Sequence, residues 1–321
     1  PIPKALATAS MLAYVGASKY ADGLPLYRLE SILSRAGIDM PRSTLANWMI
    51  TCGQLIQPII NLMQDHLFDY GLIQMDETTV QVLKEPNKAV SSKSYMWVRR
   101  GGPPDRRVIL FDYHASRAGS VPIALLADYK GYLQTDGYDG YRAVAMDPLI
   151  IHVGCWAHAR RKFDEAVKRL GKSKKGKTGK AGKALALIRK LYRIEKSLRE
   201  SEADALTRYE TRKARAGPIL TELKAWMEKV SLTVAPKSAL GKAAGYLASQ
   251  WPRLVRYLDD GRLEIDNNRV ENAIRPFVVG RKGWLFSDSV RGVKSSANLY
   301  SLIETAKAND LEPFAYLRHL F

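Results

Sequence analysis

Strand-forming sequence is confined to one part of this chain, and that distribution restricts the fold more than any other feature. After Gly71, three runs rich in β-branched and aromatic residues, at 72–83, 94–100 and 106–114, are separated by turns that contain Pro and Gly. They predict an antiparallel meander of three strands. From about 160 to 260 strand signals almost vanish, and Ala, Leu, Lys, Arg and Glu dominate. This pattern predicts an α/β protein with a separate helical segment.

Two more strands are expected after the meander. Residues 119–131 suit a short helix, and 132–138 suit a fourth strand that ends at Asp136. Residues 148–154 suit a fifth strand, which leads into a helix from Cys155. The expected core is therefore a mixed five-stranded sheet flanked by helices.

Residues 1–70 are expected to be helical. Apolar residues recur at helical spacing within 29–36, and Gly37 then ends that helix. A second helix is expected after Pro41, with Ser43 as its cap. The helix, turn and helix resemble a helix-turn-helix, and a plain helical hairpin packed on the next domain is at least as consistent with the pattern.

Positive charge is large and concentrated. The chain has 50 Lys and Arg against 32 Asp and Glu, a net charge of +18 at pH 7, and between Arg160 and Glu200 there are 16 cations and only four acids. Such an excess raises the affinity for polyanions through steering and counterion release, so nucleic acid is the leading partner. A solvated helical face with a basic loop is the alternative interpretation. The Gly- and Lys-rich run 171–183 is expected to be a flexible loop, and its candidate phosphate contacts are Lys172, Lys174, Lys175 and Lys177.

Several classes of protein are excluded by composition. The longest apolar runs fall well short of the roughly 20 residues that a membrane span needs, and the first residues show no signal-peptide pattern. The only cysteines are Cys52 and Cys155, so neither a disulfide framework nor a four-cysteine zinc site can form. We expect a cytoplasmic protein with no membrane partner.

Two aspartates occupy positions that suit few structural roles. Asp76 lies within the first apolar run, where an acid is costly to bury unless it is paired or binds a metal. Asp136 stands where the fourth strand gives way to Gly137. Two such acids and a helical Glu suit a pair of Mg²⁺ or Mn²⁺ ions, which stabilise the attacking and leaving oxygens in phosphodiester displacement.

Glu271 is the candidate third acid. It lies in a predicted helix that Asp266 or Asn267 can cap and that Pro276 is expected to limit. It is one turn after Asn267 and one turn before Arg275, so the three share a helix face. Glu271 lies 135 residues after Asp136, and the basic helical segment would then be an insertion. Candidate contacts to the DNA backbone beside it are Arg275, Arg281 and Lys282.

Several of these motifs together carry a specific resemblance, which runs from near the N-terminus to the C-terminus. They resemble the catalytic segments of transposases of the insertion sequence 66 family, and the segment that precedes them in that family. The matching stretches are 19–48, MDETTVQV (75–82), LQTDGYDGY (133–141), GCWAHARRKFDEA (154–166), 265–286 and SLIETAKANDLEPFAYL (301–317).

The resemblance implies a ribonuclease-H-like fold with a DDE triad at Asp76, Asp136 and Glu271 and two Mg²⁺ or Mn²⁺ ions. It also marks Cys155 and His158 as characteristic. On residue chemistry alone His158 is a structural or phosphate-contacting residue rather than a zinc ligand, because one Cys and one His cannot close a structural zinc site. The implied division is an N-terminal helical region 1–70, a first core part 71–160, a basic helical insertion 161–262 and a last core part 263–321.

The resemblance implies cleavage at transposon ends and transfer of the 3′-hydroxyl into target DNA. The expected setting is a nucleoid-associated bacterial protein that forms a homo-oligomer on DNA, with accessory proteins encoded by the same element. Family members usually carry a further N-terminal segment with zinc-binding and dimerising parts, which is not in this sequence, and Asn272 and Gly283 replace residues that are commonly Arg and Asn. The alternatives are a nuclease of the same fold without strand transfer, and a DNA-binding protein with a decayed active site.

Overall fold

The computed structural model describes residues 7–169 and 179–321, so the four candidate lysines of the loop, Lys172, Lys174, Lys175 and Lys177, lie outside the described residues. Five strands form one mixed sheet in the order β4-β3-β1-β5-β6. The first three strands of this sheet pair antiparallel, which confirms the predicted meander. Their bounds are β1 Leu72–Val80, β3 Ser94–Gly101, β4 Val108–His114, β5 Gly131–Gln134 and β6 Ile150–Val153.

The predicted first strand is too long. It ends at Val80, and the next residues form a separate short strand, β2 (Val82–Lys84), which pairs parallel with β7 (Ser287–Ser289). The backbone N–H of Ser287 also donates to the carbonyl of Gln81, with an N···O distance of 2.9 Å. The C-terminal segment thus supplies a partner for β2 that local sequence patterns do not reveal.

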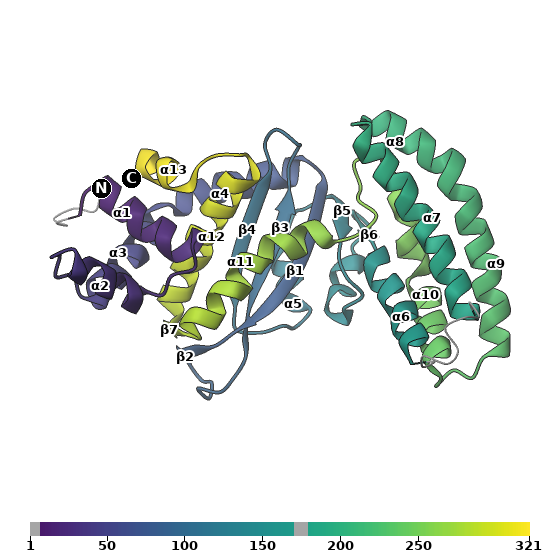
Figure 1. Ribbon diagram of the computed structural model, residues 1–321, viewed down its shortest axis with the longest axis horizontal. Helices are drawn as coiled ribbons and strands as arrows, with labels where there is room; N and C mark the ends of the chain where they lie inside the picture. Colours follow the sequence, from purple (N-terminus) through teal and green to yellow (C-terminus); the bar gives the residue numbers. More distant parts are fainter. Residues whose placement is uncertain (1–6, 170–178) are drawn as a thin grey trace. The chain divides into compact units, whose positions relative to one another are not determined.

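One face of the meander is covered by two helices from the end of the chain. Opposite residues of an antiparallel pair point to the same face, and the register aligns Asp76, Val98 and Phe111 across β1, β3 and β4. The Phe111 ring lies 6.3 Å from that of Phe277 in α11 (Asn268–Trp284) and 5.5 Å from that of Tyr300 in α12 (Val290–Ala308). Figure 1 shows α11 crossing these strands. Asp76 therefore belongs to the face that α11 and α12 cover.

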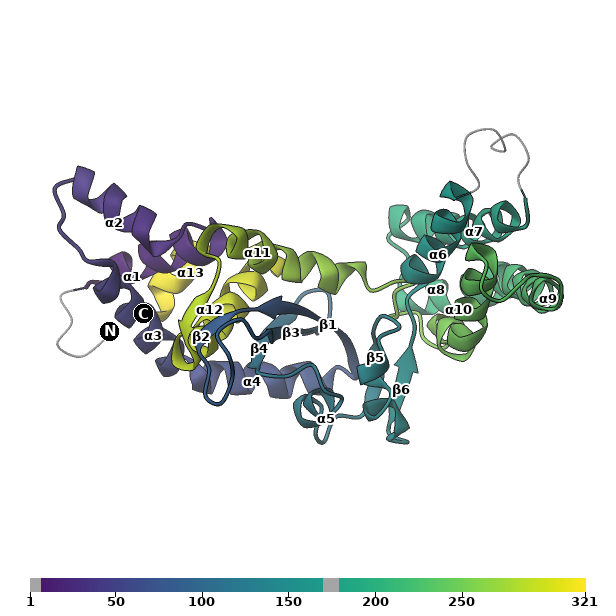
Figure 2. The same ribbon diagram turned by 90° about the horizontal axis from the view of Figure 1, so that it is seen from below.

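The opposite face packs on α4 (Gln57–Asp69) and α5 (Ser120–Leu125). The buried Arg99 of β3 forms an ion pair with Asp112, at 3.0 Å. Its remaining N–H groups donate to Gln64 of α4 and to the carbonyl of Leu125, at 2.9 and 2.8 Å. Figure 2 shows α4 and α11 on opposite sides of β1, β3 and β4, so this part of the chain has three layers.

The N-terminal region is helical, as predicted, but its capping differs. Ser43 is not a cap: Pro41 occupies that position, and no side chain caps the helix there. The backbone N–H of Arg42 instead donates to Glu30 of the preceding helix, at 3.0 Å. A π-helical turn, Ala17–Ala21, follows the first helix. The helices are α1 Ala9–Gly16, α2 Leu26–Arg35, α3 Arg42–Leu55 and, from the end of the chain, α13 Pro313–Leu320.

Pro276 does not end the helix that carries Glu271. The helix α11 continues to Trp284, with Pro276 in its interior. Pro276 lacks the N–H that would bond to the carbonyl of residue 272, and Asn272 lies on the exposed side where water can satisfy that carbonyl. The apolar residues beyond the proline, among them the fully buried Phe277, hold the helix on the sheet and outweigh the lost hydrogen bond.

The chain divides into two compact units. The first comprises residues 1–131, 142–150 and 269–321, and the second comprises 132–141 and 151–268. The predicted division into four segments remains a prediction. Among the described residues, no helix combines the length and the apolar character that crossing a bilayer requires.

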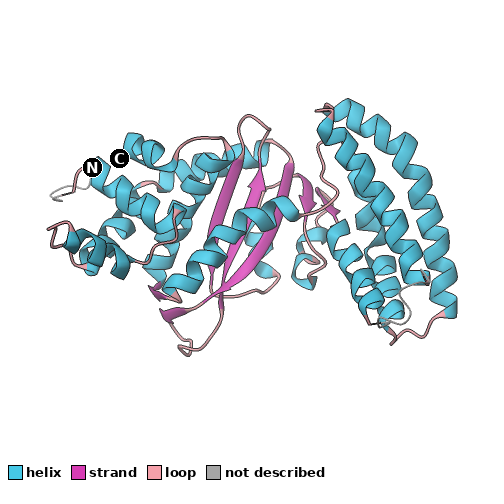
Figure 3. Cartoon of the chain, viewed as in Figure 1, coloured by secondary structure: helices cyan, strands magenta, loops and turns pink. Residues whose placement is uncertain are grey.

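Helices dominate the second unit, as the sequence predicted for 160–260 (Figure 3). Aromatic pairs lie between them: the Phe163 and Trp226 rings are 5.7 Å apart, and those of Trp156 and Trp251 are 6.1 Å apart. The described helices are α6 Trp156–Lys168, α7 Lys180–Glu200, α8 Ala205–Thr211, α9 Gly217–Thr233 and α10 Ala239–Leu254.

Candidate active site

Asp76 lies in the middle of β1, half-buried, on the face that α11 covers. Its Oδ1 accepts the backbone N–H of Glu77, with an N···O distance of 2.8 Å. Gln74, two residues earlier and on the same face, is fully buried, whereas Asp76 and Thr78 are not. Side chains on this face therefore become more exposed from Asp76 onward, so a strand holds the Asp76 carboxylate where solvent can reach it.

Glu77, the next residue along β1, has a different environment. Strand alternation points it to the opposite face, and its side chain is only 2 % exposed. Arg117, in the loop before α5, donates from Nε to Glu77 Oε1 at 2.8 Å. This ion pair was missed by sequence reasoning, although the alternation of β1 separates the two acids. Glu77 thus has a structural role, in which it holds the loop before α5 to β1.

Glu271 lies in the first turn of α11 and is half-buried. It follows the buried Val270 and precedes the buried Ile274, so it flanks the stripe that packs on the sheet. Near the other end of the helix, Arg281 donates to the hydroxyl oxygens of Thr78 and Thr79 in β1, both at 3.2 Å. The helix that bears Glu271 is therefore bonded to the strand that bears Asp76.

Asp136 belongs to the second unit. It comes two residues after β5, so the predicted strand ends earlier than expected, and its Oδ1 accepts the backbone N–H of Tyr138 at 2.8 Å. The following Gly137 has no room for a side chain, because a Cβ there would lie 2.6 Å from the hydroxyl of Tyr246. Burial, with smaller contributions from Cys155 and Asp136, raises the pKa of Tyr246. Asp136 is thus held in a tight turn at the end of a strand.

Cys155 and His158 are brought together at the start of α6. The Cys155 Sγ lies 3.2 Å from His158 Nδ1, and it accepts the backbone N–H of Asn267 at 3.3 Å. Burial raises the pKa of the Cys155 thiol to about 12. The hydrogen bond from Asn267 gives Cys155 a structural role, in which it anchors the turn before α11.

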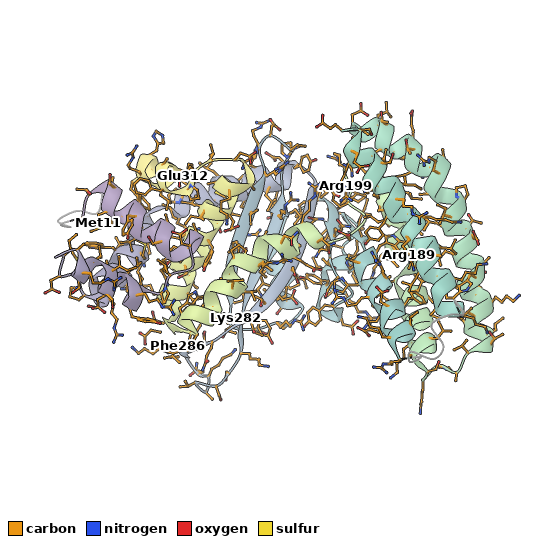
Figure 4. The ribbon with its side chains drawn as sticks, viewed as in Figure 1. Met11, Arg189, Arg199, Lys282, Phe286 and Glu312 are labelled. Atoms are coloured by element: carbon orange, nitrogen blue, oxygen red, sulfur yellow. The ribbon has the colours of Figure 1, made fainter. Side chains whose placement is uncertain are left out.

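The candidate backbone contacts lie in different settings. Arg275 and Lys282 are exposed on α11, whereas Arg281 is half-buried and holds the two threonines of β1. In the second unit, Arg189 and Arg199 are exposed on α7 (Figure 4). Arg275 and Lys282 therefore have the exposure that a phosphate contact needs, and Arg281 also has a structural role.

Together these features define an α/β protein in which half-buried acids stand on a sheet and on the helix that covers it. The family model described as "Transposase IS66 family" matches residues 4–295, and the one described as "IS66 C-terminal element" matches residues 301–321. The chain therefore belongs to the IS66 family of transposases.

Proteins from Sinorhizobium fredii (strain NBRC 101917 / NGR234) are similar to almost the whole of this chain. "Uncharacterized protein y4qI" is 33% identical over 98% of this chain and 59% of its own length. "Uncharacterized protein y4jD" is 30% identical over 97% of this chain and 61% of its own length. The chain thus spans about three fifths of the length of these relatives.

Proposed function

We propose that this chain is the catalytic part of a DNA transposase that hydrolyses phosphodiester bonds at the ends of its element and transfers the resulting 3′-hydroxyl into target DNA. The observation that carries the proposal is the placement of Asp76 on the sheet face covered by α11, the helix that bears Glu271. Family membership supports the same activity.

The sheet supports a ribonuclease-H-like core. Counted along the chain, its strands have the spatial order 3-2-1-4-5, with the first three antiparallel. Asp76 lies on the central strand of this order, and Asp136 follows the fourth strand. A core of this topology places acids at the middle of the sheet, where the backbone is rigid.

Asp76, Asp136 and Glu271 would hold Mg²⁺ or Mn²⁺, as two ions in the proposed mechanism. The fit rests on donor chemistry: carboxylate oxygens suit hard divalent ions, and Asp76 and Glu271 are half-buried rather than sealed in the interior. When bound, such ions stabilise the charge on the attacking and leaving oxygens. The acids orient their oxygens through the strand, turn and helix that carry them, and Arg275 and Lys282 bind the DNA backbone.

The proposed partners follow from the activity and the charge. They are the terminal repeats of the element and the target DNA, bound by a homo-oligomer with accessory proteins of the same element. The proposed setting is the bacterial nucleoid. The excess of cations between Arg160 and Glu200 supports binding to DNA of any sequence, because phosphate contacts depend on charge and not on bases.

The test is a strand cleavage and joining assay with the element's own end. Wild-type protein should cut and join DNA only with Mg²⁺ or Mn²⁺, and Asp76→Asn should bind the DNA without cutting it. The matched control is Asp105→Asn, since Asp105 is exposed and forms a surface ion pair with its neighbour Arg106. Cutting without joining would assign the chain to nucleases, and cutting that survives chelation or Asp76→Asn would contradict the proposed mechanism.

A further inference from the structure

A cavity of about 810 Å³ lies in the first unit, between α2, α3 and the end of α11. Its volume is typical of sites that take up a small ligand or a part of a larger one. Five aromatic residues from separate segments line it: Tyr20, Tyr27, Trp284, Phe286 and Tyr300. None of the roles proposed for the acids uses this cavity.

Two of the aromatic side chains that line the cavity are exposed. Tyr27 is 47% exposed and Phe286 is 43% exposed, although large aromatic side chains usually bury most of their surface. The Phe286 side chain projects beyond the end of α11 (Figure 4). Leu285, between Trp284 and Phe286, has a φ of 63°, which is uncommon for a residue other than glycine. Leu285 directly follows the last residue of α11, and a left-handed residue commonly ends a helix at that position.

The charges around the cavity favour an anion with a flat apolar part. The ammonium of Lys19 lies 5.3 Å from the ring centre of Tyr20 and 5.8 Å from that of Trp284. Arg42 adds an exposed cation at the start of α3. The one acid in the lining, Asp288, forms an ion pair with Lys84, at 2.8 Å. A nucleotide meets these conditions, because its base stacks on aromatic rings and its phosphate pairs with cations.

We propose that this cavity binds one unpaired nucleotide of the DNA on which the protein acts, with the base stacked between Tyr27 and Phe286 and the phosphate beside Arg42. This inference rests on the proposed function. The helix α11 supports it, because this one helix carries the candidate catalytic Glu271 in its first turn and the cavity residue Trp284 at its end. Those positions are about 20 Å apart at the rise of an α-helix, a span of about six nucleotides at the spacing of duplex DNA and of fewer in an extended single strand.

The experiment uses a duplex of the element's end whose strand continues past the cut phosphate as a single-stranded tail. The fluorescent base 2-aminopurine replaces one base of the tail at a time, and the protein carries Asp76→Asn so that the DNA stays intact. Stacking quenches the fluorescence, so the quench should be largest at one position within about six nucleotides of the cut phosphate.

Pocket variants supply the second readout. Tyr27→Ala and Phe286→Ala should each abolish the quench and weaken binding of the tailed DNA by about 5- to 150-fold, the range found for the loss of one stacked base. Tyr27→Trp should keep the quench. Tyr14→Ala is the matched control, because Tyr14 is also exposed but lies outside the cavity lining, and it should change neither quantity.

A quench that persists in both alanine variants, or an abasic tail that binds wild-type protein as well as the normal tail, would overturn the inference. The inference would also be overturned if Tyr27→Ala changed the oligomeric state and left the 2-aminopurine quench unchanged, since the cavity would then be a contact between protein molecules. If the wild-type chain cuts no DNA and the quench still depends on Tyr27, the proposed activity fails and this site stands. If the wild-type chain cuts DNA and the quench does not depend on Tyr27, the proposed activity stands and this site fails.

Discussion

A buried ion pair of the second unit and the candidate acids of the first unit differ in their burial. In the second unit Arg212 is fully buried, donates to both carboxylate oxygens of Glu195, and donates to the carbonyls of Tyr257, Asp260 and Leu263 at 2.8 to 3.1 Å. In the first unit the acids proposed for catalysis, Asp76 and Glu271, are only half-buried. A buried charge enclosed by protein groups holds one conformation, whereas a half-buried acid keeps access to a ligand. In this comparison the structural charge is fully buried, and the candidate catalytic acids keep contact with solvent.

The largest effect is expected from opening the buried pair of the second unit. Arg212→Met leaves Glu195 with one less cation in a buried site, so the free energy of unfolding should fall by about 3–5 kcal/mol. Adding Glu195→Leu should restore a large part of that loss, because the uncompensated charge is then removed. Urea unfolding followed by circular dichroism measures both variants, and a loss below about 1 kcal/mol for Arg212→Met would contradict a structural role for the pair.

A smaller effect is expected at the two consecutive acids of β1. Glu77→Gln weakens a hydrogen-bonded ion pair with Arg117 at a buried carboxylate, which should cost about 1–3 kcal/mol. Asp76→Asn should cost less, because its side chain is half-buried. The same unfolding measurement ranks the two, and the reverse order would assign Asp76 the structural role.

A pH-dependent effect is expected from His152, which contacts the Thr135 hydroxyl at 2.8 Å. Burial, with a smaller effect of Arg253, lowers its pKa from 6.5 to about 3. The unfolded chain therefore takes up the proton first, so this contribution to stability is complete above pH 6.5 and is lost as the pH falls toward 3. The loss should be about 1.4 kcal/mol per pH unit. Unfolding between pH 6.5 and 4 should show a shallower slope in His152→Gln, and equal slopes would refute the assignment.

The smallest effect on stability is expected on the exposed cations of α7. Arg189→Ala and Arg199→Ala should each change the free energy of unfolding by no more than about 0.5 kcal/mol. Together they should lower DNA affinity and make its dependence on salt less steep, since fewer counterions are released. Lys172, Lys174, Lys175 and Lys177 can be replaced by Ala in the same titration. An unchanged salt slope in both sets of variants would identify this segment as a solvated surface.

Much of the sheet was predictable, because period-two apolar runs and Gly- and Pro-containing turns are local signals. Three features were not predictable, since each depends on residues distant in sequence. They are the limits of β1, the pairing of β2 with β7 and the continuation of α11 past Pro276. Local patterns record propensity, and tertiary packing overrides it.

The sequence singled out the candidate acids as an Asp in an apolar run, an Asp at a strand end and a helical Glu, and their catalytic role stays a prediction. Their structural neighbours were not predictable: the partner of Glu77 is 40 residues away, and that of Cys155 is 112 residues away. The cavity joins Tyr27 to Phe286, and no spacing rule connects residues so far apart in sequence. Residue types thus indicate which chemistry is possible, whereas the groups that surround each residue are known only from the fold.

The central claim is that α11 presents Glu271 to the sheet face that bears Asp76. Its most direct test is the cleavage rate of Glu271→Gln on the element's end, beside Glu264→Gln. Glu264 is the matched control, because it lies before the helix, within 3.9 Å of Arg208. Both variants should fold and bind DNA, Glu264→Gln should cut at the wild-type rate, and Glu271→Gln should show no cleavage. Cleavage by folded Glu271→Gln at the wild-type rate would contradict the claim.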